Sequence, residues 1–165
     1  MYLKITNAEE THHGIQYHNG LNIDQISFSQ EGSCCPGGIY FTTPKYICNF
    51  LDMGHYIREV VIPEDAEMVQ DPQGNKWRSS KVVLAKKKDL RKPATWKWLV
   101  ENGVDIHAYN DYALIYAAGR GYFEVVKYLI KAGADIHTRN DYVFRKASYN
   151  GHAKIVKYLE KQCQI

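Results

Sequence analysis

Most of the residues that could perform metal chemistry lie within the first 60 positions of the chain. Histidine and cysteine are common zinc ligands, but no pair in this segment has the C-x2-C spacing of a zinc finger. Adjacent cysteines would also point in opposite directions in an extended strand, which makes it difficult for them to share one ion. We therefore predict no metal site, although the segment contains His12, His13, His18, Cys34, Cys35, Cys48 and His55.

A second chemical pattern combines three short motifs in the same segment. His13-Gly14 comes first, Gly20-Leu21 follows, and the run Gly38-Ile39-Tyr40-Phe41 comes third. Glycines of this kind can make tight turns, and tyrosine and phenylalanine pack well in sheets, so a purely structural interpretation is available. We favour that interpretation and expect no catalytic residue and no cofactor.

The alternative interpretation rests on a resemblance. In order and rough spacing, the three motifs are similar to the H-G, G-L and G-x-Y-F succession of ADP-ribosyltransferase-like domains. That resemblance implies an enzyme in which His13 and Tyr40 hold the nicotinamide end of NAD. It also implies a glutamate on a later strand, for which the candidates are Glu59, inside a predicted strand, and Glu64, just after it.

Residues 1–85 are expected to form the small β-rich domain that carries these motifs. Short apolar stretches separated by Gly, Pro and Asn are typical of strands. One helix is expected to begin at Pro44, with Thr43 as its N-cap, and to end at Gly54. A turn is expected over 71–75. The predicted strands are 2–5, 26–28, 38–42, 56–62, 67–69 and 81–84.

The second half of the chain repeats itself at an offset of 30 residues. Residues 103–132 and 133–162 are identical at 14 of 30 positions. A fixed period of this length predicts stacked helical units that bury their apolar faces against one another. Residues 93–102 align with the end of a unit and form a half repeat. Residues 86–92, which are rich in lysine, are expected to be the junction between the domains.

Within each unit the apolar spacing predicts two antiparallel helices. Alanines such as Ala113 and Ala117 allow close helix approach, and Gly121 ends the first helix. The run AAGRGYFEVVKYLIKAGADI (117–136) resembles the ankyrin repeat, shortened by three residues at the turn before the first helix. Units of 30 residues with an N-D-Y start resemble those of ankyrin proteins from giant amoeba-infecting viruses. Asp111 and Asp141 are expected to cap the first helices.

We therefore predict an α+β protein whose β-rich domain packs against about two and a half ankyrin-like repeats. The resemblance implies a non-enzymatic module that binds a host or viral protein. Exposed aromatic and arginine side chains are the usual anchors of such binding. The expected binding residues are Tyr109, Asp111, Tyr112, Tyr116, Arg120, Arg139, Asp141, Tyr142 and Tyr149.

Composition excludes several other classes of function. No apolar run approaches the roughly 18 residues needed to cross a bilayer, and the N-terminus lacks a signal-peptide layout. A formal charge of +3 is too small to predict nucleic-acid binding by itself, because such binding requires a basic patch, and we expect none. We expect an intracellular monomer with reduced cysteines, in the host cytoplasm if the protein is viral.

The small number of repeats generates a folding prediction. Stacks of this kind generally need about three units, so the first helix is expected to require cover from the β-rich domain. A fragment of residues 93–165 should therefore unfold without a cooperative transition when it is heated and followed by circular dichroism. A cooperative, fully folded fragment would contradict this prediction.

Overall fold

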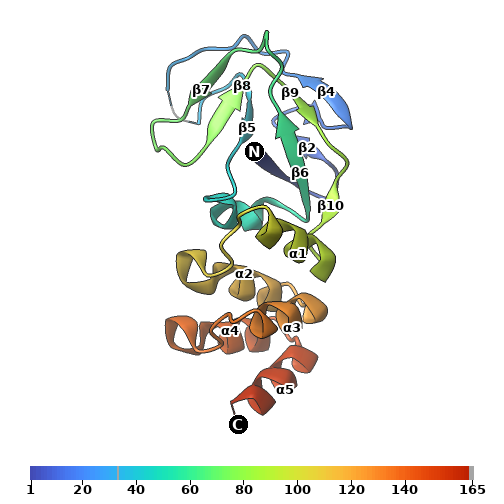
Figure 1. Ribbon diagram of the computed structural model, residues 1–165, viewed down its shortest axis with the longest axis vertical. Coiled ribbons are helices and arrows are strands. Elements are labelled where there is room, and N and C mark those ends of the chain that lie inside the picture. Colours follow the sequence, from blue (N-terminus) through green and yellow to red (C-terminus); the bar gives the residue numbers. More distant parts are fainter. Residues whose placement is uncertain (33, 164–165) are drawn as a thin grey trace. The chain divides into compact units, whose positions relative to one another are not determined.

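The computed structural model describes residues 1–32 and 34–163, which divide into two compact units. The first unit is Met1–Asp89 and the second begins at Leu90. This division falls within the basic segment 86–92, part of which forms a strand. Figure 1 shows that the first unit consists mainly of strands and the second consists of helices. The fold class predicted from the sequence is therefore confirmed.

Short strands and one 3-10 helix make up the N-terminal unit. The helix, η1, spans Ile47–Met53 and ends at Gly54 as predicted, but it begins three residues later than expected and is not an α-helix. The strands are β1 (Tyr2–Thr6), β2 (Thr11–His12), β3 (Ile15–Gln16), β4 (Gly20–Ile23), β5 (Ile39–Phe41), β6 (Tyr56–Val61), β7 (Met68–Gln70), β8 (Trp77–Ser79), β9 (Lys81–Leu84) and β10 (Lys88–Asp89).

The strands form antiparallel sheets. One sheet has the order β1-β6-β9-β4, and β10 also pairs with β6. A second has the order β5-β8-β7, and β2 and β3 form a hairpin. Reciprocal backbone hydrogen bonds between Leu3 and Thr42, with N···O distances of 2.7 and 2.9 Å, join the first two sheets where β1 passes the end of β5.

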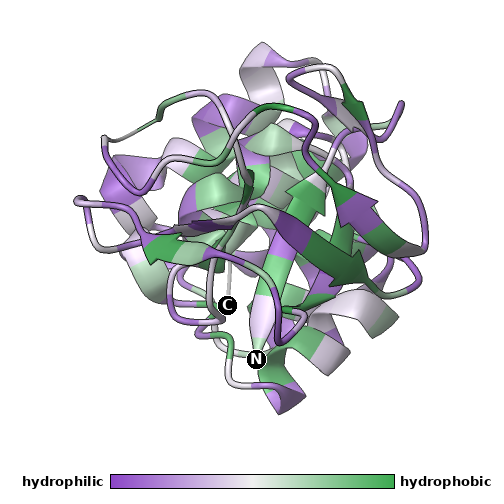
Figure 2. Cartoon of the chain, turned by 90° about the horizontal axis from the view of Figure 1, so that it is seen from above, coloured by the Kyte–Doolittle hydropathy of each residue, from purple (hydrophilic) through white to green (hydrophobic). Residues whose placement is uncertain are grey.

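An apolar core lies between these sheets. Ile39 and Phe41 of β5 pack with Val60, Val82 and Leu84 of the larger sheet. Hydrophobic and hydrophilic residues both occur along the strands in Figure 2, as expected when successive side chains point to opposite faces. This packing fixes β5 beside β1 and so positions the cavity described below.

The segment 26–28, predicted as a strand, is an irregular loop instead. Asp24 organises it, because its carboxylate accepts hydrogen bonds from the Ile26 amide (2.9 Å) and the Gly38 amide (2.7 Å). The fully buried Arg78 donates to the carbonyl oxygens of Gly37 (2.8 Å) and Glu31 (2.7 Å). These side-chain contacts take the place of a strand ladder.

A buried ion pair connects β6 to the loop after β1. Arg58 donates to the carboxylate of Glu10, whose other oxygen accepts a 2.6 Å hydrogen bond from the Thr6 hydroxyl. Arg58 also donates to Asn19 (2.8 Å) and to the Ala85 carbonyl (2.7 Å). The side chains of Arg58 and Glu10 are only 4% and 7% exposed, so each charge depends on the other for compensation.

The second unit is a stack of helices joined by short turns. Helices α2 and α4 pack on each other in one layer, and α3 packs on α1 and α5 in the other. Figure 1 shows the helices stacked in chain order from α1 to α5. The bounds are α1 (Pro93–Glu101), α2 (Ala108–Gly119), α3 (Phe123–Lys131), α4 (Thr138–Tyr149) and α5 (Ala153–Gln162).

Small and branched apolar residues fill the space between the layers. Ala113 and Ala117 of α2 are fully buried, as are Val126 and Leu129 of α3. The alanines allow the close helix approach that the sequence predicted. After α2, Gly121 adopts a left-handed conformation (φ 77°), which lets the chain reverse directly into α3.

The buried ion pair between Arg58 and Glu10 in the N-terminal unit generates a stability prediction. Glu10→Gln would leave the Arg58 guanidinium buried without a countercharge, which should lower the free energy of unfolding by about 3 to 5 kcal/mol. Glu9→Gln is the matched control, because Glu9 is the exposed neighbour. Urea denaturation checks both. Equal, small effects of the two substitutions would show that the pair does not stabilise the unit.

Candidate functional site

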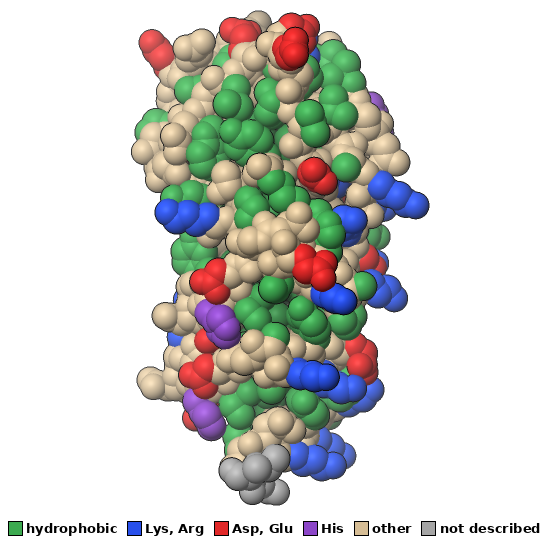
Figure 3. Space-filling view, viewed as in Figure 1, with side chains coloured by type: hydrophobic (Ala, Val, Ile, Leu, Met, Phe, Trp, Pro, Cys, Tyr) green, Lys and Arg blue, Asp and Glu red, His purple; other side chains and the backbone are tan. Residues whose placement is uncertain are grey.

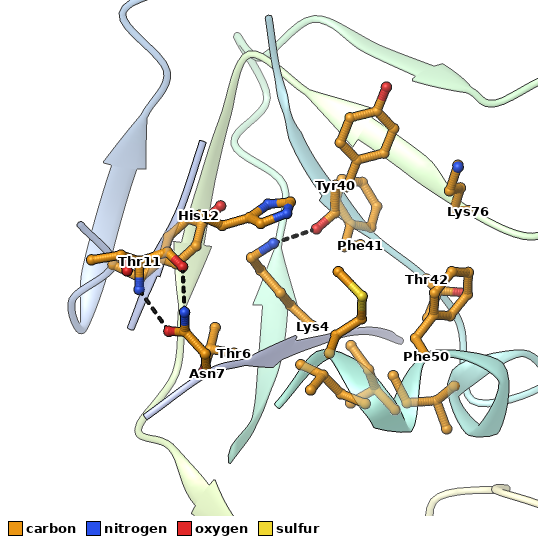
Figure 4. Close-up of a pocket in the computed structure, with 15 residues that line it drawn as sticks. Lys4, Thr6, Asn7, Thr11, His12, Tyr40, Phe41, Thr42, Phe50 and Lys76 are labelled. Atoms are coloured by element: carbon orange, nitrogen blue, oxygen red, sulfur yellow. Dashed lines mark hydrogen bonds between the residues drawn. The ribbon is translucent and has the colours of Figure 1, made fainter. Parts of the chain in front are cut away.

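A cavity of about 100 Å³ lies in the N-terminal unit. β1, β5 and η1 supply most of its walls, and the β2 hairpin supplies one side (Figure 4). Phe41, Ile47, Phe50 and Met53 make much of the lining apolar. Among the lining residues, Met53 is 52% exposed.

Lys4 is the most unusual residue of the cavity. Its side chain comes from the middle of β1, and the residue is 6% exposed. Its ammonium group donates a 2.8 Å hydrogen bond to the Tyr40 carbonyl and lies 4.6 Å from the centre of the Tyr17 ring. Burial lowers the pKa of Lys4 from 10.5 to about 7, because the charged form loses its hydration.

His12 lies beside Lys4 in the same cavity (Figure 4). Burial, with smaller contributions from the charges of Lys4 and His13, lowers the pKa of His12 to about 4. Its ring is therefore neutral at physiological pH and can both donate and accept a hydrogen bond. No hydrogen-bond partner of this ring occurs among residues 1–32 and 34–163.

The three residues of the enzyme alternative come from three different sheets. His13 lies in the turn of the β2–β3 hairpin, Tyr40 lies on β5, and Glu59 lies on β6, each in a different sheet. Only Tyr40 lines the cavity, and its hydroxyl donates to the Cys35 carbonyl at 3.3 Å. His13 and Glu59 are not among the residues that line this cavity. Gly37 and Gly38 make a turn with φ of 85° and 100°.

The histidines and cysteines do not gather in one place. Within the described part of the chain, no three His, Cys, Asp or Glu residues lie close enough to hold a metal ion. Cys48 lies on η1 and is buried, at 1% exposure. Cys34 lies near Lys76, with 2.8 Å between Sγ and Nζ.

A different candidate site lies in the helical unit, at the turn that enters each first helix. Tyr109, Asn110 and Asp111 all adopt left-handed conformations, with φ of 58°, 58° and 53°. An N-cap residue usually has an extended backbone, so Asp111 is not the N-cap that we expected. Instead it accepts a 2.7 Å hydrogen bond from Nδ1 of His107.

The next repeat reproduces this turn in detail. Arg139, Asn140 and Asp141 have φ of 49°, 56° and 58°. His137 Nδ1 lies 2.6 Å from an oxygen of Asp141, again four residues later. The three-residue shortening of the ankyrin-like unit is therefore accommodated by a left-handed turn in both repeats, and the expectation that Asp141 caps α4 is corrected in the same way.

Side chains bind the two turns to each other. Arg139 donates to the Tyr109 carbonyl (2.7 Å), and the Thr138 hydroxyl donates to the Asn110 carbonyl (3.0 Å). The guanidinium of Arg139 also lies 5.8 Å from the centre of the Tyr112 ring. The exposed side chains of consecutive turns are thus held in a fixed register.

Burial separates the predicted binding residues. Tyr109, Arg139 and Asp141 are exposed at the turns, and Tyr112 and Tyr142 are half-buried beside them. Asp111 is buried, because the following repeat covers its turn; its side chain is 10% exposed, against 62% for Asp141. The expectation that Asp111 forms part of an exposed surface is therefore corrected.

Tyr116 is also buried, at 3% exposure, and packs edge-on against Tyr122 with ring centres 5.7 Å apart. This corrects the expectation that it is exposed. Arg120, at the C-terminal end of α2, and Tyr149, at the C-terminal end of α4, are both exposed, and Tyr149 is 87% exposed. They are separated from the turns by the length of a helix, about 12 Å.

Charge is unevenly distributed over the helical unit. In the view of Figure 3, histidine and acidic side chains recur along one flank, while lysine and arginine gather along the other. Repetition of His107–Asp111 as His137–Asp141 accounts for part of the first flank. In the described ranges, no helix is long and apolar enough to span a membrane.

Sequence reasoning missed Lys4 and His12 as cavity residues. The available signal was a lysine between Leu3 and Ile5 in a strand that is buried on both faces. A lysine in an apolar strand usually reaches solvent, so this signal was weak.

The lowered pKa of Lys4 generates a prediction about pH. The unfolded chain binds more protons than the folded protein between the folded pKa of about 7 and the unfolded value of 10.5. The free energy of unfolding contributed by Lys4 therefore rises with pH across this window, by up to about 5 kcal/mol. Urea denaturation of Lys4→Met across the window should lack this rise, whereas the exposed control Lys86→Met should retain it. Parallel curves for wild type and Lys4→Met would refute the shift.

Comparison with known proteins adds the family. Residues 82–165 match the family model described as "Ankyrin repeats (3 copies)". Two Acanthamoeba polyphaga mimivirus proteins named as ankyrin repeat proteins, R868 and R229, are similar to this chain. Protein R868 is 40% identical over 132 residues, covering 77% of this chain and 65% of that protein. Protein R229 is 47% identical over 118 residues, covering 67% and 38%.

The chain thus spans about two thirds or less of the length of these two relatives. The uncharacterized mimivirus protein R869 is 38% identical over 131 residues, covering 76% of this chain and 94% of that protein. No solved structure matches the chain significantly. The repeats, their helical pairs and the family match agree, and the chain belongs to the ankyrin repeat family.

Proposed function

We propose that this chain binds a host or viral protein through the left-handed turns of its repeats and the adjoining ends of α2 and α4. Ankyrin repeats are a protein-interaction module, and the mimivirus relatives support a viral setting. Neither similarity identifies the partner. The observation that carries the proposal is the fixed register of the exposed side chains at consecutive turns.

Preorganisation is the physical reason for favouring the turns. Ordering a loop during association costs free energy, so a surface that is already rigid binds more tightly. Hydrogen bonds from Arg139 and Thr138 to the preceding turn supply that rigidity before any partner arrives. Tyr109 is 40% exposed, and an aromatic ring of this kind offers a large contact area at small entropic cost.

The electrostatics of the turns limit the kind of partner. Asp105, Asp135 and Asp141 are exposed carboxylates within or just before the turns, and Arg139 is an exposed cation of the second turn. A partner surface that offers basic side chains and an apolar centre would complement this arrangement. Asp111 and Tyr116 are buried and are not part of the proposed surface.

Affinity capture from amoebal lysate with the full chain tests the proposal. The double substitution Tyr109→Ala and Tyr142→Ala should reduce specific capture at least about tenfold, because it removes two aromatic anchors. The matched control is Lys127→Ala with Lys157→Ala, on the exposed sides of α3 and α5. Capture should survive in the control, and thermal unfolding should show that both variants remain folded.

The contrary result is equally clear. If the tyrosine double variant retains full capture while the lysine double variant loses it, the partner binds α3 and α5 instead of the turns. Loss of capture confined to Tyr149→Ala would move the interface to the opposite end of α4.

A further inference from the structure

The cavity of the N-terminal unit contains a buried lysine, Lys4, that has no carboxylate partner in the described part of the chain. Among residues 1–32 and 34–163, the Lys4 ammonium group hydrogen-bonds only to the Tyr40 carbonyl, and it also lies over the Tyr17 ring. Its cross-strand neighbour is a second buried base, Arg58. The nearby carboxylate of Glu10 is occupied by Arg58 and the Thr6 hydroxyl. Burying an ammonium group without a countercharge is costly, so the site favours an anion.

Five titratable residues line the cavity, and only the two lysines among them can carry a charge at neutral pH. They are Lys4, His12, Tyr17, Tyr40 and Lys76, and none of the lining residues is an aspartate or glutamate. Lys76 lies at one side, where its Nζ is 3.7 Å from the Asp71 carboxylate, so its charge is already compensated. Lys4 is therefore the cation that remains available to a ligand.

A second polar group faces the same space. Figure 4 shows the ring of His12 directed toward the Lys4 ammonium group. The neutral ring has no hydrogen-bond partner in the described part of the chain and can donate one. Lys4 and His12 together can thus contact both oxygens of one carboxylate.

The rest of the cavity is suited to an apolar body. Phe41 and Ile47 form buried walls, and Phe50 and Met53 border the opening. A volume of about 100 Å³ is of the same order as cavities that hold one benzene molecule, about 150 Å³. A longer ligand would have to extend past Met53 into solvent.

We propose that this cavity binds a small monocarboxylic acid with a flat apolar body, whose carboxylate pairs with Lys4 and accepts a hydrogen bond from His12. A single negative charge matches the one uncompensated lysine. A phosphate dianion would bring a second charge that the cavity has no free cation to balance. This site is separate from the protein-binding surface proposed for the repeats.

Three probes test the proposal on the full chain by NMR. Benzoate carries both the charge and the apolar body, benzamide keeps the shape without the charge, and acetate keeps the charge without the body. Benzoate should shift the methyl signals of Ile5 and Ile47, which line the cavity. The shifts should saturate with a Kd of about 1 mM. Ile155, in α5, should not shift. Benzamide and acetate should each bind at least about tenfold more weakly.

Substitutions then test the assigned residues. Lys4→Met should weaken benzoate binding at least about tenfold, and His12→Phe should weaken it less, because only a neutral hydrogen bond is lost. Lys86→Met is the control and should leave the affinity unchanged. The wild-type comparison of benzoate with benzamide remains decisive even if Lys4→Met does not fold.

Several results would overturn the proposal. Equal affinity for benzoate and benzamide would refute the ion pair. Full benzoate affinity in folded Lys4→Met would do the same. Absence of saturable shifts at Ile5 and Ile47 up to about 10 mM benzoate would refute binding in the cavity.

Discussion

The 30-residue period is the constraint on which the helical unit depends. The chain must pass from the second helix of one repeat into the first helix of the next repeat three residues sooner than in the usual ankyrin unit. The chain meets this requirement with three successive left-handed residues, 109–111 and again 139–141. Such residues cost roughly 1 to 2 kcal/mol each when they carry a side chain, although Asn and Asp tolerate the conformation better. Hydrogen bonds from His107, Thr138 and Arg139 hold the turns in place.

This constraint also links structure to the proposed binding. Because side chains that hold one turn are bonded to the backbone of the turn before it, two neighbouring turns behave as one surface. The same stacking explains why Asp111 is buried whereas its counterpart Asp141 is exposed. Repeat stacking therefore decides which side chains of each turn remain exposed.

The N-terminal unit depends on how its buried charges are compensated. Arg58 has Glu10, and Arg78 has the carbonyl oxygens of Gly37 and Glu31. Lys4 has neither a carboxylate nor several carbonyls, which distinguishes it from the two arginines. The proposed carboxylate ligand would supply the missing countercharge. That chemical role does not require the His13, Tyr40 and Glu59 arrangement that an NAD enzyme would need.

Features set by local pattern could be predicted from the sequence, whereas features set by long-range contacts could not. The helical pairs followed from the repeat and from small residues such as Ala117, and β6 followed from its apolar run. The loop at 26–28 was predicted wrongly, because Asp24 and the distant Arg78 determine it. The burial of Tyr116 and the position of Lys4 likewise depend on neighbours far away in sequence. The left-handed turns were missed because Tyr109 and Arg139 rarely adopt that conformation.

Site-specific photo-cross-linking is the most direct test of protein binding through the turns. A photoreactive phenylalanine derivative can replace Tyr109 at the first turn or, as the reference, Tyr128 on α3, the second helix of that repeat. Binding through the turns predicts a partner cross-link from position 109 and none from position 128. A cross-link from position 128 with none from position 109 would contradict it.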